Sequence, residues 1–573
     1  MAEAEQKRSL ADTPLWERTP PIRGWIGAGR GETVNVTVPT EFRGSTYQVC
    51  GLWPFAAGSG APIIGAPLGR HLETGASICA DPISWFYAGL INNPSLFEMA
   101  LPALGKSTVS RRIVGASSGF GYIPFVLGDL KPDYVDLIRR LGGQVLTLGN
   151  GRGYINVLAP GDTDEAAQLI TAAIERASAA GELVEAQLRA GVDEAGLQAI
   201  TAALDEVTPL LTSSMLVDAD EWYLADIEIR LSLLGAYITG TQSILDGLLE
   251  DAHARKTTMT ATLISIQRQG TLADWEETIL DRAVRILERD FEGVPVLGDL
   301  LELIQSAPDE LRLLALDGGN LERYREITRM LEQSLIGLVH GGRLGQTFSR
   351  HTTAQQRRDS PVAYDVSAIK DSEPDLQGAV LMACWSAGFA TINAAHALSD
   401  AGVEPARIYL VVMDELHRAL RTGPGMVDRV DGLTRLNRNE GVGQIMITHT
   451  MKDLDSLPTE EDRAKARGLV ERSGMLILGG LPPGEMPLLQ RAITLSKKEQ
   501  DRLASWTDPA PYDLKTGKRG TPPGRGKFLI KVGGSPGLPF QMELTAVEAG
   551  VHDTNKRWKT RSSIGRVRRE EFA

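Results

Sequence analysis

The residues best suited to chemistry in this sequence are a lysine and a hydroxyl that follow a glycine, Gly105-Lys106-Ser107. They close the pattern G-x-x-x-x-G-K-[ST], in which a tight turn and a helix N-terminus direct backbone N–H groups at phosphates. In this pattern the lysine reaches the β- and γ-phosphate oxygens, and the hydroxyl is a ligand of Mg²⁺. We therefore predict that six consecutive residues bind the phosphates of a nucleotide: Ala103, Leu104, Gly105, Lys106, Ser107 and Thr108.

The pattern lacks its first glycine, because Ala100 stands at that position. Glycine would allow a positive φ or a close approach of the backbone to the ligand, and alanine restricts both. With one glycine missing, the segment also fits a lysine at the start of an exposed helix. A second motif is needed to decide between these interpretations.

That second motif is an apolar run rich in β-branched residues, Ile408–Met413, followed by the acids Asp414 and Glu415. Its length and composition predict a buried strand. At the strand end, the aspartate would hold Mg²⁺ and the glutamate would orient or deprotonate the attacking water, while Lys106 neutralises charge on the γ-phosphate. A strand that merely ends in solvated acids is the alternative. Two motifs in one chain favour the catalytic interpretation.

A third candidate segment is Gly443–Thr450, which we expect to form a strand that ends in hydroxyls and His449. At the end of such a strand a polar side chain can sense the γ-phosphate or orient water, because ligands bind at the carboxyl ends of parallel strands. A capped surface histidine is an equally open interpretation.

The elements that must position these residues alternate between strands and helices. We expect strands at 122–127, 144–148 and 361–367, and helices at 135–141 and 376–398. Alternation of this kind is typical of an α/β protein with a parallel sheet.

From residue 163 to about residue 350, the pattern changes to apolar residues three and four positions apart, which indicates helices. So long a helical insertion cannot be a loop, and we expect a separate all-α lobe. The expected segments are a β-rich N-terminal segment (1–90), the first part of a P-loop NTPase core (91–162), the all-α lobe (163–355), the second part of the core (356–500) and a basic C-terminal segment (501–573).

The composition of the 573 residues excludes several classes of protein. The net charge of -13 argues against binding nucleic acid over the whole surface, so any such contact needs a local patch. Three scattered cysteines are too few for a disulfide framework, which fits a reducing compartment. The N-terminus lacks the apolar stretch of a signal peptide, and no apolar run is long enough to span a membrane. The sequence therefore predicts a cytoplasmic protein.

The charge balance reverses near the C-terminus, where residues 514–573 contain thirteen Lys or Arg and five acids. Basic residues around Trp558 could bind a nucleic-acid strand or anionic lipid. Docking on an acidic neighbouring subunit is the other interpretation. Within this segment, 527–532 and 539–544 are expected to form a hairpin.

The ordered motifs resemble the conjugative type IV secretion ATPases, TraC-like members of the HerA and FtsK superfamily, especially the short actinobacterial conjugation ATP-binding proteins. The resembling segments span roughly residues 50 to 545 and are Asn93–Phe97 with the loop after it, Gly128–Tyr134, Tyr154–Leu158, Val411–Arg418, Leu433–Arg438 and Ile447–Leu454.

The resemblance implies a RecA-like motor core carrying the all-α lobe, with ATP and Mg²⁺ as cofactors. It implies a homo-hexamer that works with secretion-channel proteins at the inner face of a membrane, peripheral to it, and moves DNA or protein. Lys106 and Ser107 would hold phosphate and Mg²⁺, Asp414 would support the metal, and Glu415 would be the base. Arg435 and Arg438 would be candidates for the arginine that reaches a neighbouring subunit's nucleotide, with helix-surface arginines as the alternative.

This chain departs from the family in three respects. Relatives usually have glycine at the positions of Ala100 and Ala103, many have glutamine at the position of His449, and longer relatives have an extensive N-terminal domain. An FtsK- or HerA-like DNA translocase shares the same core and stays open as an alternative. A non-hydrolysing, nucleotide-gated scaffold of a secretion channel also stays open, although the intact Lys106, Asp414 and Glu415 argue against it.

Overall fold

The computed structural model describes residues 62–149, 151–159, 161–422, 426–428, 430, 441–513 and 518–551. Seven parallel strands form the centre of one sheet, in the order β9-β3-β8-β7-β4-β6-β5. These strands are β3 (Ser95–Met99), β4 (Ile123–Asp129), β5 (Gln144–Thr147), β6 (Val362–Asp365), β7 (Tyr409–Met413), β8 (Val442–Thr448) and β9 (Met475–Leu478). All residues of β3, β7, β8 and β9 are buried, as expected for strands covered on both faces.

The register of the central strands brings their carboxyl ends together. Met99 of β3 is paired with Thr448 of β8, and Met413 of β7 is paired with Met446 of β8. Because β4 is the next neighbour of β7, the loops after β3, β8, β7 and β4 emerge side by side at one edge of the sheet.

Four antiparallel strands extend the sheet beyond β9, in the order β12-β13-β1-β2. They are β12 (Lys527–Lys531), β13 (Leu538–Met542), β1 (Pro67–His71) and β2 (Ser77–Cys79). The expected hairpin near the C-terminus is therefore confirmed. The sequence pattern predicts a parallel sheet, whereas the observed sheet is mixed, and strands from both expected terminal segments belong to it.

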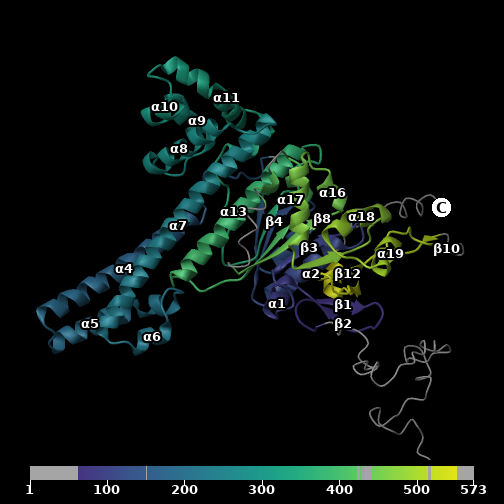
Figure 1. The fold of residues 1–573 in the computed structure, drawn as a ribbon, viewed down its shortest axis with the longest axis horizontal. Coiled ribbons are helices and arrows are strands. Elements are labelled where there is room, and N and C mark those ends of the chain that lie inside the picture. The colour runs from purple at the N-terminus through teal and green to yellow at the C-terminus, as the bar shows by residue number, and fades with distance from the viewer. Residues whose placement is uncertain are drawn as a thin grey trace, which may run out of the picture. The chain divides into compact units, whose positions relative to one another are not determined.

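Helices cover both faces of the sheet (Figure 1). On one face lie α1 (Pro82–Tyr87), α2 (Lys106–Gly119) and α3 (Val135–Arg140), whose apolar residues pack against Leu96, Val126 and Val412. The opposite face is covered by helices that include α13 (Pro374–Asp400) and α17 (Glu460–Glu471). The remaining helical elements of the core are α14 (Leu416–Leu420), α16 (Met451–Asp455), η2 (Pro483–Glu485), α18 (Met486–Ala492), α19 (Lys497–Ser505) and α20 (Ala546–Val551); β10 (Tyr512–Asp513) and β11 (Lys518–Arg519) form a separate ribbon.

The buried character expected for the long helix at 376–398 is confirmed by α13. In the described part of the chain, it is the one helix long and apolar enough to cross a membrane, with a mean hydropathy of 1.3. Of that apolar window, 83% is buried inside the protein, which is the environment of a core helix.

Nine helices occupy the span expected to be helical: α4 (Thr163–Ala190), α5 (Glu194–Ser213), α6 (Ala219–Leu224), α7 (Ile227–Arg268), α8 (Asp274–Asp290), α9 (Leu297–Ser306), α10 (Asp309–Ala315), α11 (Leu321–Val339) and α12 (Gly342–Phe348). Side chains cap the N-termini of several of these helices. At the start of α7, for example, the Asp226 carboxylate accepts a hydrogen bond of 2.9 Å from Ile229 N. Figure 1 shows α4 beside α7, and both helices contact α13. That this lobe is a separate domain remains a prediction.

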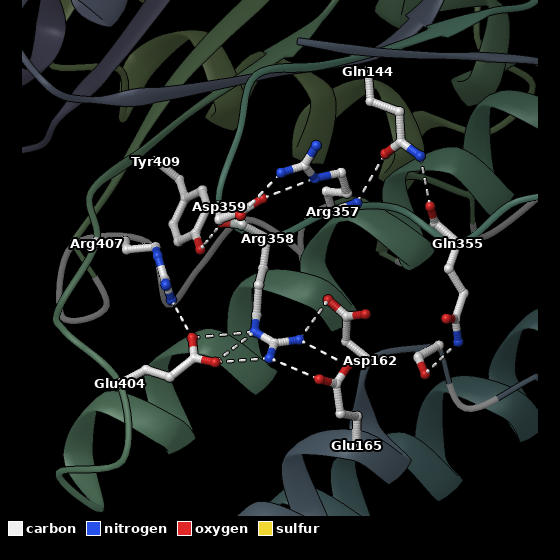
Figure 2. A network of polar contacts seen from close by, with 11 residues as sticks. Gln144, Asp162, Glu165, Gln355, Arg357, Arg358, Asp359, Glu404, Arg407 and Tyr409 are labelled. Carbon is white, nitrogen blue, oxygen red and sulfur yellow. Dashed lines mark hydrogen bonds and ion pairs between the residues drawn. The ribbon is translucent and has the colours of Figure 1, made fainter. Parts of the chain in front are cut away.

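A polar network centred on Arg358 lies where the chain passes from the helical lobe back into the core (Figure 2). The mostly buried guanidinium of Arg358 donates to Glu404 at 2.7 Å and to Glu165 of α4 at 3.2 Å. Its backbone carbonyl accepts a hydrogen bond of 2.8 Å from the Tyr409 hydroxyl at the start of β7. On the other side, Gln144 of β5 accepts a 2.9 Å hydrogen bond from the Arg357 N–H. The network thus connects α4 to β7, the strand that precedes Asp414.

We expect Arg358→Met to lower the free energy of unfolding by about 3 kcal/mol, because it removes the mostly buried cation that Asp162, Glu165 and Glu404 share. The matched control is Arg357→Met, whose exposed side chain pairs with exposed Asp359 and should contribute no more than about 0.5 kcal/mol. Urea denaturation of the two variants measures the difference. Equal destabilisation by both substitutions would show that the network does not hold this junction.

Candidate active site

A cavity of about 480 Å³ lies where the four neighbouring strands β3, β8, β7 and β4 end. Each strand delivers one chemically active group to it: Lys106 follows β3, His449 follows β8, Asp414 follows β7, and Lys131 follows β4. Parallel strands covered by helices bind ligands at this edge. The positions of these four side chains therefore follow from the strand order.

The loop before α2 has the form of a phosphate-binding turn. Strand β3 ends at Met99, and α2 begins at Lys106 with Gly105 as its N-cap at a φ of 107°. This left-handed conformation favours glycine. Ala103 is also left-handed, at a φ of 68°, which costs about 1 kcal/mol for a residue with a Cβ. The loop therefore keeps this backbone conformation without a glycine at position 103.

Ala100 is accommodated in a different way. It is fully buried and is absent from the described residues with positive φ. A Cβ placed on Gly479 would lie 2.6 Å from the Ala100 methyl group. The missing side chain at Gly479 therefore makes room for the methyl group at position 100, and the substitution leaves the loop backbone in place.

Lys106 and the acidic pair meet in this cavity although they are distant in the sequence. Lys106 is mostly buried, and its Nζ donates to the Thr448 carbonyl oxygen at 3.2 Å. The same Nζ lies 2.9 Å from His449 Nδ1, a residue 343 positions away. His449 Nε2 in turn lies 3.1 Å from Glu415 Oε2. A lysine, a histidine and a glutamate thus form a continuous polar chain.

The pKa values of the two acids are shifted in opposite directions. Burial raises the pKa of Asp414 to about 6, although the charge of Lys106 opposes this shift. Burial also acts to raise the pKa of Glu415, but the hydrogen bond from His449 and the charge of Lys106 outweigh it and hold that pKa well below its usual range. Glu415 is therefore charged and can only accept hydrogen bonds.

Glu415 has an unusual backbone conformation. Its φ of 52° and ψ of 38° are left-handed, immediately before α14. Residues other than glycine in this region cluster at functional sites, where the surrounding structure maintains the strain. The conformation follows directly on Asp414 and directs the two adjacent carboxylates into one cavity.

Lys131 and Arg111 also line the cavity, and no role was assigned to them from the sequence. Lys131 Nζ lies 3.0 Å from Glu415 Oε1. Arg111 donates to the Ser107 carbonyl oxygen at 2.9 Å and to the Asp133 carbonyl oxygen at 2.8 Å, which links α2 to the loop after β4. The available signal for Lys131 was its place in Gly128–Tyr134, just beyond a strand. Such loops carry ligand-binding groups in parallel sheets.

Five of the six predicted phosphate-binding residues line this cavity: Ala103, Gly105, Lys106, Ser107 and Thr108. Leu104 differs, because its side chain is buried and lies against Gly480, so the residue can act only through its backbone. Arg435 and Arg438 lie outside the described residues, as does the basic segment around Trp558.

The residues present fit a magnesium ion. The Ser107 hydroxyl and the Asp414 carboxylate, which both line the cavity, are hard oxygen ligands of the kind Mg²⁺ prefers. Within the described ranges, no cluster of three His, Cys, Asp or Glu residues could hold a metal by itself. Because Mg²⁺ is commonly held by one or two protein groups together with substrate phosphates, this donor set is sufficient.

Comparison with known proteins supports the fold. No family model matches the sequence, and no curated protein matches it. The structure of VirB4 of Thermoanaerobacter pseudethanolicus is similar, with a TM-score of 0.52, 15% identity, and coverage of 86% of this chain and 100% of that chain. The unbound bacterial conjugative coupling protein TrwBdeltaN70 has a TM-score of 0.42 and 11% identity, over 84% of this chain and 89% of that one. The plasmid coupling protein TrwB in complex with ADP and Mg²⁺ has a TM-score of 0.41 and 10% identity, over 83% of this chain and 89% of that chain.

The likeness to VirB4, together with the observed topology, confirms the expected fold class. The chain has an α/β, RecA-like P-loop NTPase core with a large inserted all-α lobe.

Proposed function

We propose that this chain is a P-loop ATPase that powers conjugative, type IV secretion-like transfer of DNA or protein. The observation that carries the proposal is the convergence of Lys106, Asp414 and Glu415 on one cavity at the carboxyl ends of parallel strands. The order of motifs in the sequence and the VirB4-like fold support the same assignment.

On the basis of this geometry, we propose a task for each side chain. The phosphates bind at the N-terminus of α2, where the first-turn N–H groups and Lys106 supply positive charge. Glu415 is charged and accepts a hydrogen bond from the attacking water, which it orients towards the terminal phosphate. When bound to Ser107 and Asp414, Mg²⁺ would neutralise charge on the phosphate oxygens.

His449 connects phosphate binding to the base. Because the lysine ammonium is a donor only, His449 Nδ1 must accept from Lys106, which leaves the ring proton on Nε2, 3.1 Å from Glu415 Oε2. This arrangement defines one tautomer of a neutral imidazole. A phosphate that draws Lys106 away from His449 would therefore alter the hydrogen bonding of Glu415 as well.

The wider assembly forms part of the proposal. We propose a homo-hexamer, peripheral to the inner face of the cell membrane, that works with secretion-channel proteins. Arg435 and Arg438 are the proposed candidates for an arginine that reaches the nucleotide of a neighbouring subunit. The basic C-terminal residues are a proposed contact for DNA.

Release of phosphate from ATP by the purified full-length protein tests the proposal. We expect phosphate release that depends on Mg²⁺ and increases when DNA is added or when the protein assembles. Light scattering on a sizing column measures the state of assembly. Binding of ATP without phosphate release, both alone and with DNA, would instead support a nucleotide-gated scaffold. Absence of ATP binding would remove both assignments.

A further inference from the structure

Part of the wall of the cavity is built by the C-terminal hairpin and the residues that flank its strands, none of which has an assigned role. Thr521, Arg525, Gly526, Gln541, Met542 and Leu544 line this wall. Gly526 N donates to the Leu104 carbonyl oxygen at 2.8 Å, so the hairpin is fixed directly to the phosphate-binding loop. We propose, on the basis of the proposed function, that this hairpin binds the nucleoside end of the nucleotide and that Arg525 is its main contact.

The direction of the nucleotide follows from the position of Glu415. Water must attack the terminal phosphate, so the γ end of the chain of phosphates lies beside Glu415, His449 and Lys131. The ribose and base must then extend away from these residues. In the described part of the protein, no hydrogen bond or ion pair links the lining residues of the hairpin to those three side chains. The hairpin instead contacts the loop at Leu104.

The chemistry of the hairpin wall matches a nucleoside. Arg525 is exposed at the turn, and its guanidinium has no hydrogen-bond or ion-pair partner among the described residues. Its neighbours on the wall include no carboxylate, and Met542 and Leu544 are apolar. A guanidinium without an acidic partner can stack on a base or donate to ribose oxygens, while the apolar side chains contact the base edge.

The local structure holds Arg525 in this position. Gly526 has a φ of 73°, which lets the chain turn so that its N–H points to Leu104 and its carbonyl accepts from Met542 N at 2.7 Å. Gln541 Nε2 donates to the carbonyl oxygens of Gly526 and Arg525, at 3.2 and 3.4 Å. A Cβ on Gly524 would lie 2.0 Å from the Trp506 carbonyl oxygen, so the turn is packed on its other side. Arg525 therefore projects from a braced turn.

The experiment compares the affinities of full-length variants for ATP and for inorganic tripolyphosphate, each with Mg²⁺, by calorimetry. Tripolyphosphate has the phosphates without the nucleoside. We expect Arg525→Ala to weaken ATP binding by about tenfold or more, which corresponds to one lost charge-assisted contact, and to leave tripolyphosphate affinity unchanged. Lys527→Ala is the matched control, because it removes a positive charge at the start of β12, two residues from Arg525, without lining the cavity. It should bind both ligands as the wild type does.

Two results would overturn the inference while leaving the proposed function intact. One is unchanged ATP affinity in Arg525→Ala when the wild type binds ATP. The other is an equal loss for both ligands, which would place Arg525 at the phosphates. A wild-type protein that binds neither ligand would instead overturn the proposed function itself, and the inference with it. Circular dichroism of the variants verifies that the exposed substitutions leave the fold unchanged.

Discussion

Replacing Glu415 by glutamine is expected to reduce the rate of ATP hydrolysis by about 10²- to 10⁴-fold, the range contributed by a positioned acid or base. The amide has the same size but cannot take a proton, and with one acceptor oxygen in place of two it cannot face both Lys131 and His449 with an acceptor. ATP affinity should change little, because Lys106 and the α2 N-terminus remain. Phosphate release at saturating ATP, together with calorimetric ATP binding, separates the two effects.

A matched control substitution removes a carboxylate charge outside the cavity. Glu460 on α17 is exposed and pairs with Arg463 and Arg467, outside the cavity, so Glu460→Gln should hydrolyse ATP at the wild-type rate. If Glu415→Gln also keeps the wild-type rate, Glu415 is not the base. A parallel loss of binding and turnover in Glu415→Gln would indicate that the substitution disrupts the cavity rather than the chemical step.

The sequence was sufficient for the elements of the fold but not for their arrangement. The apolar run before Asp414 and the buried periodicity of α13 identify a strand and a helix from local pattern alone. Strand order depends on packing between residues hundreds of positions apart. The placement of β8 between β3 and β7 is what brings His449 to both Lys106 and Glu415. No local pattern encodes that placement.

The same limit explains which parts of the candidate site were missed. Lys131 and Arg525 lie in turns, where side chains show no periodicity, and their role depends on which strand end faces the turn. Ala100 is the reverse case. In the sequence it is a defect in a motif, whereas in the structure Gly479 leaves the space that its methyl group needs. A compensating pair of this kind becomes visible only when both strands are placed.

Replacing Lys106 by alanine is expected to weaken ATP binding by about 100-fold or more, because it removes the charge-assisted hydrogen bonds to two phosphates. Lys106 is mostly buried at the start of α2, and Lys131, the other lysine that lines the cavity, is paired with Glu415. Calorimetry with ATP and Mg²⁺ measures the loss, and Lys106→Met, which keeps most of the side-chain volume, separates lost charge from lost packing.

The control for the lysine substitution is Lys452→Ala on α16, an exposed lysine outside the cavity whose partner is Glu485. It should bind ATP as the wild type does. If Lys106→Ala and Lys106→Met both bind ATP with wild-type affinity, the nucleotide does not occupy this cavity. Lys106 would then be a structural cation that balances the buried acids, and the polar chain from Lys106 through His449 to Glu415 would serve stability rather than hydrolysis. Loss of binding in both variants, with folding intact, would leave phosphate recognition as the role of the lysine charge, because Lys106→Met keeps most of the side-chain volume and lacks only the charge.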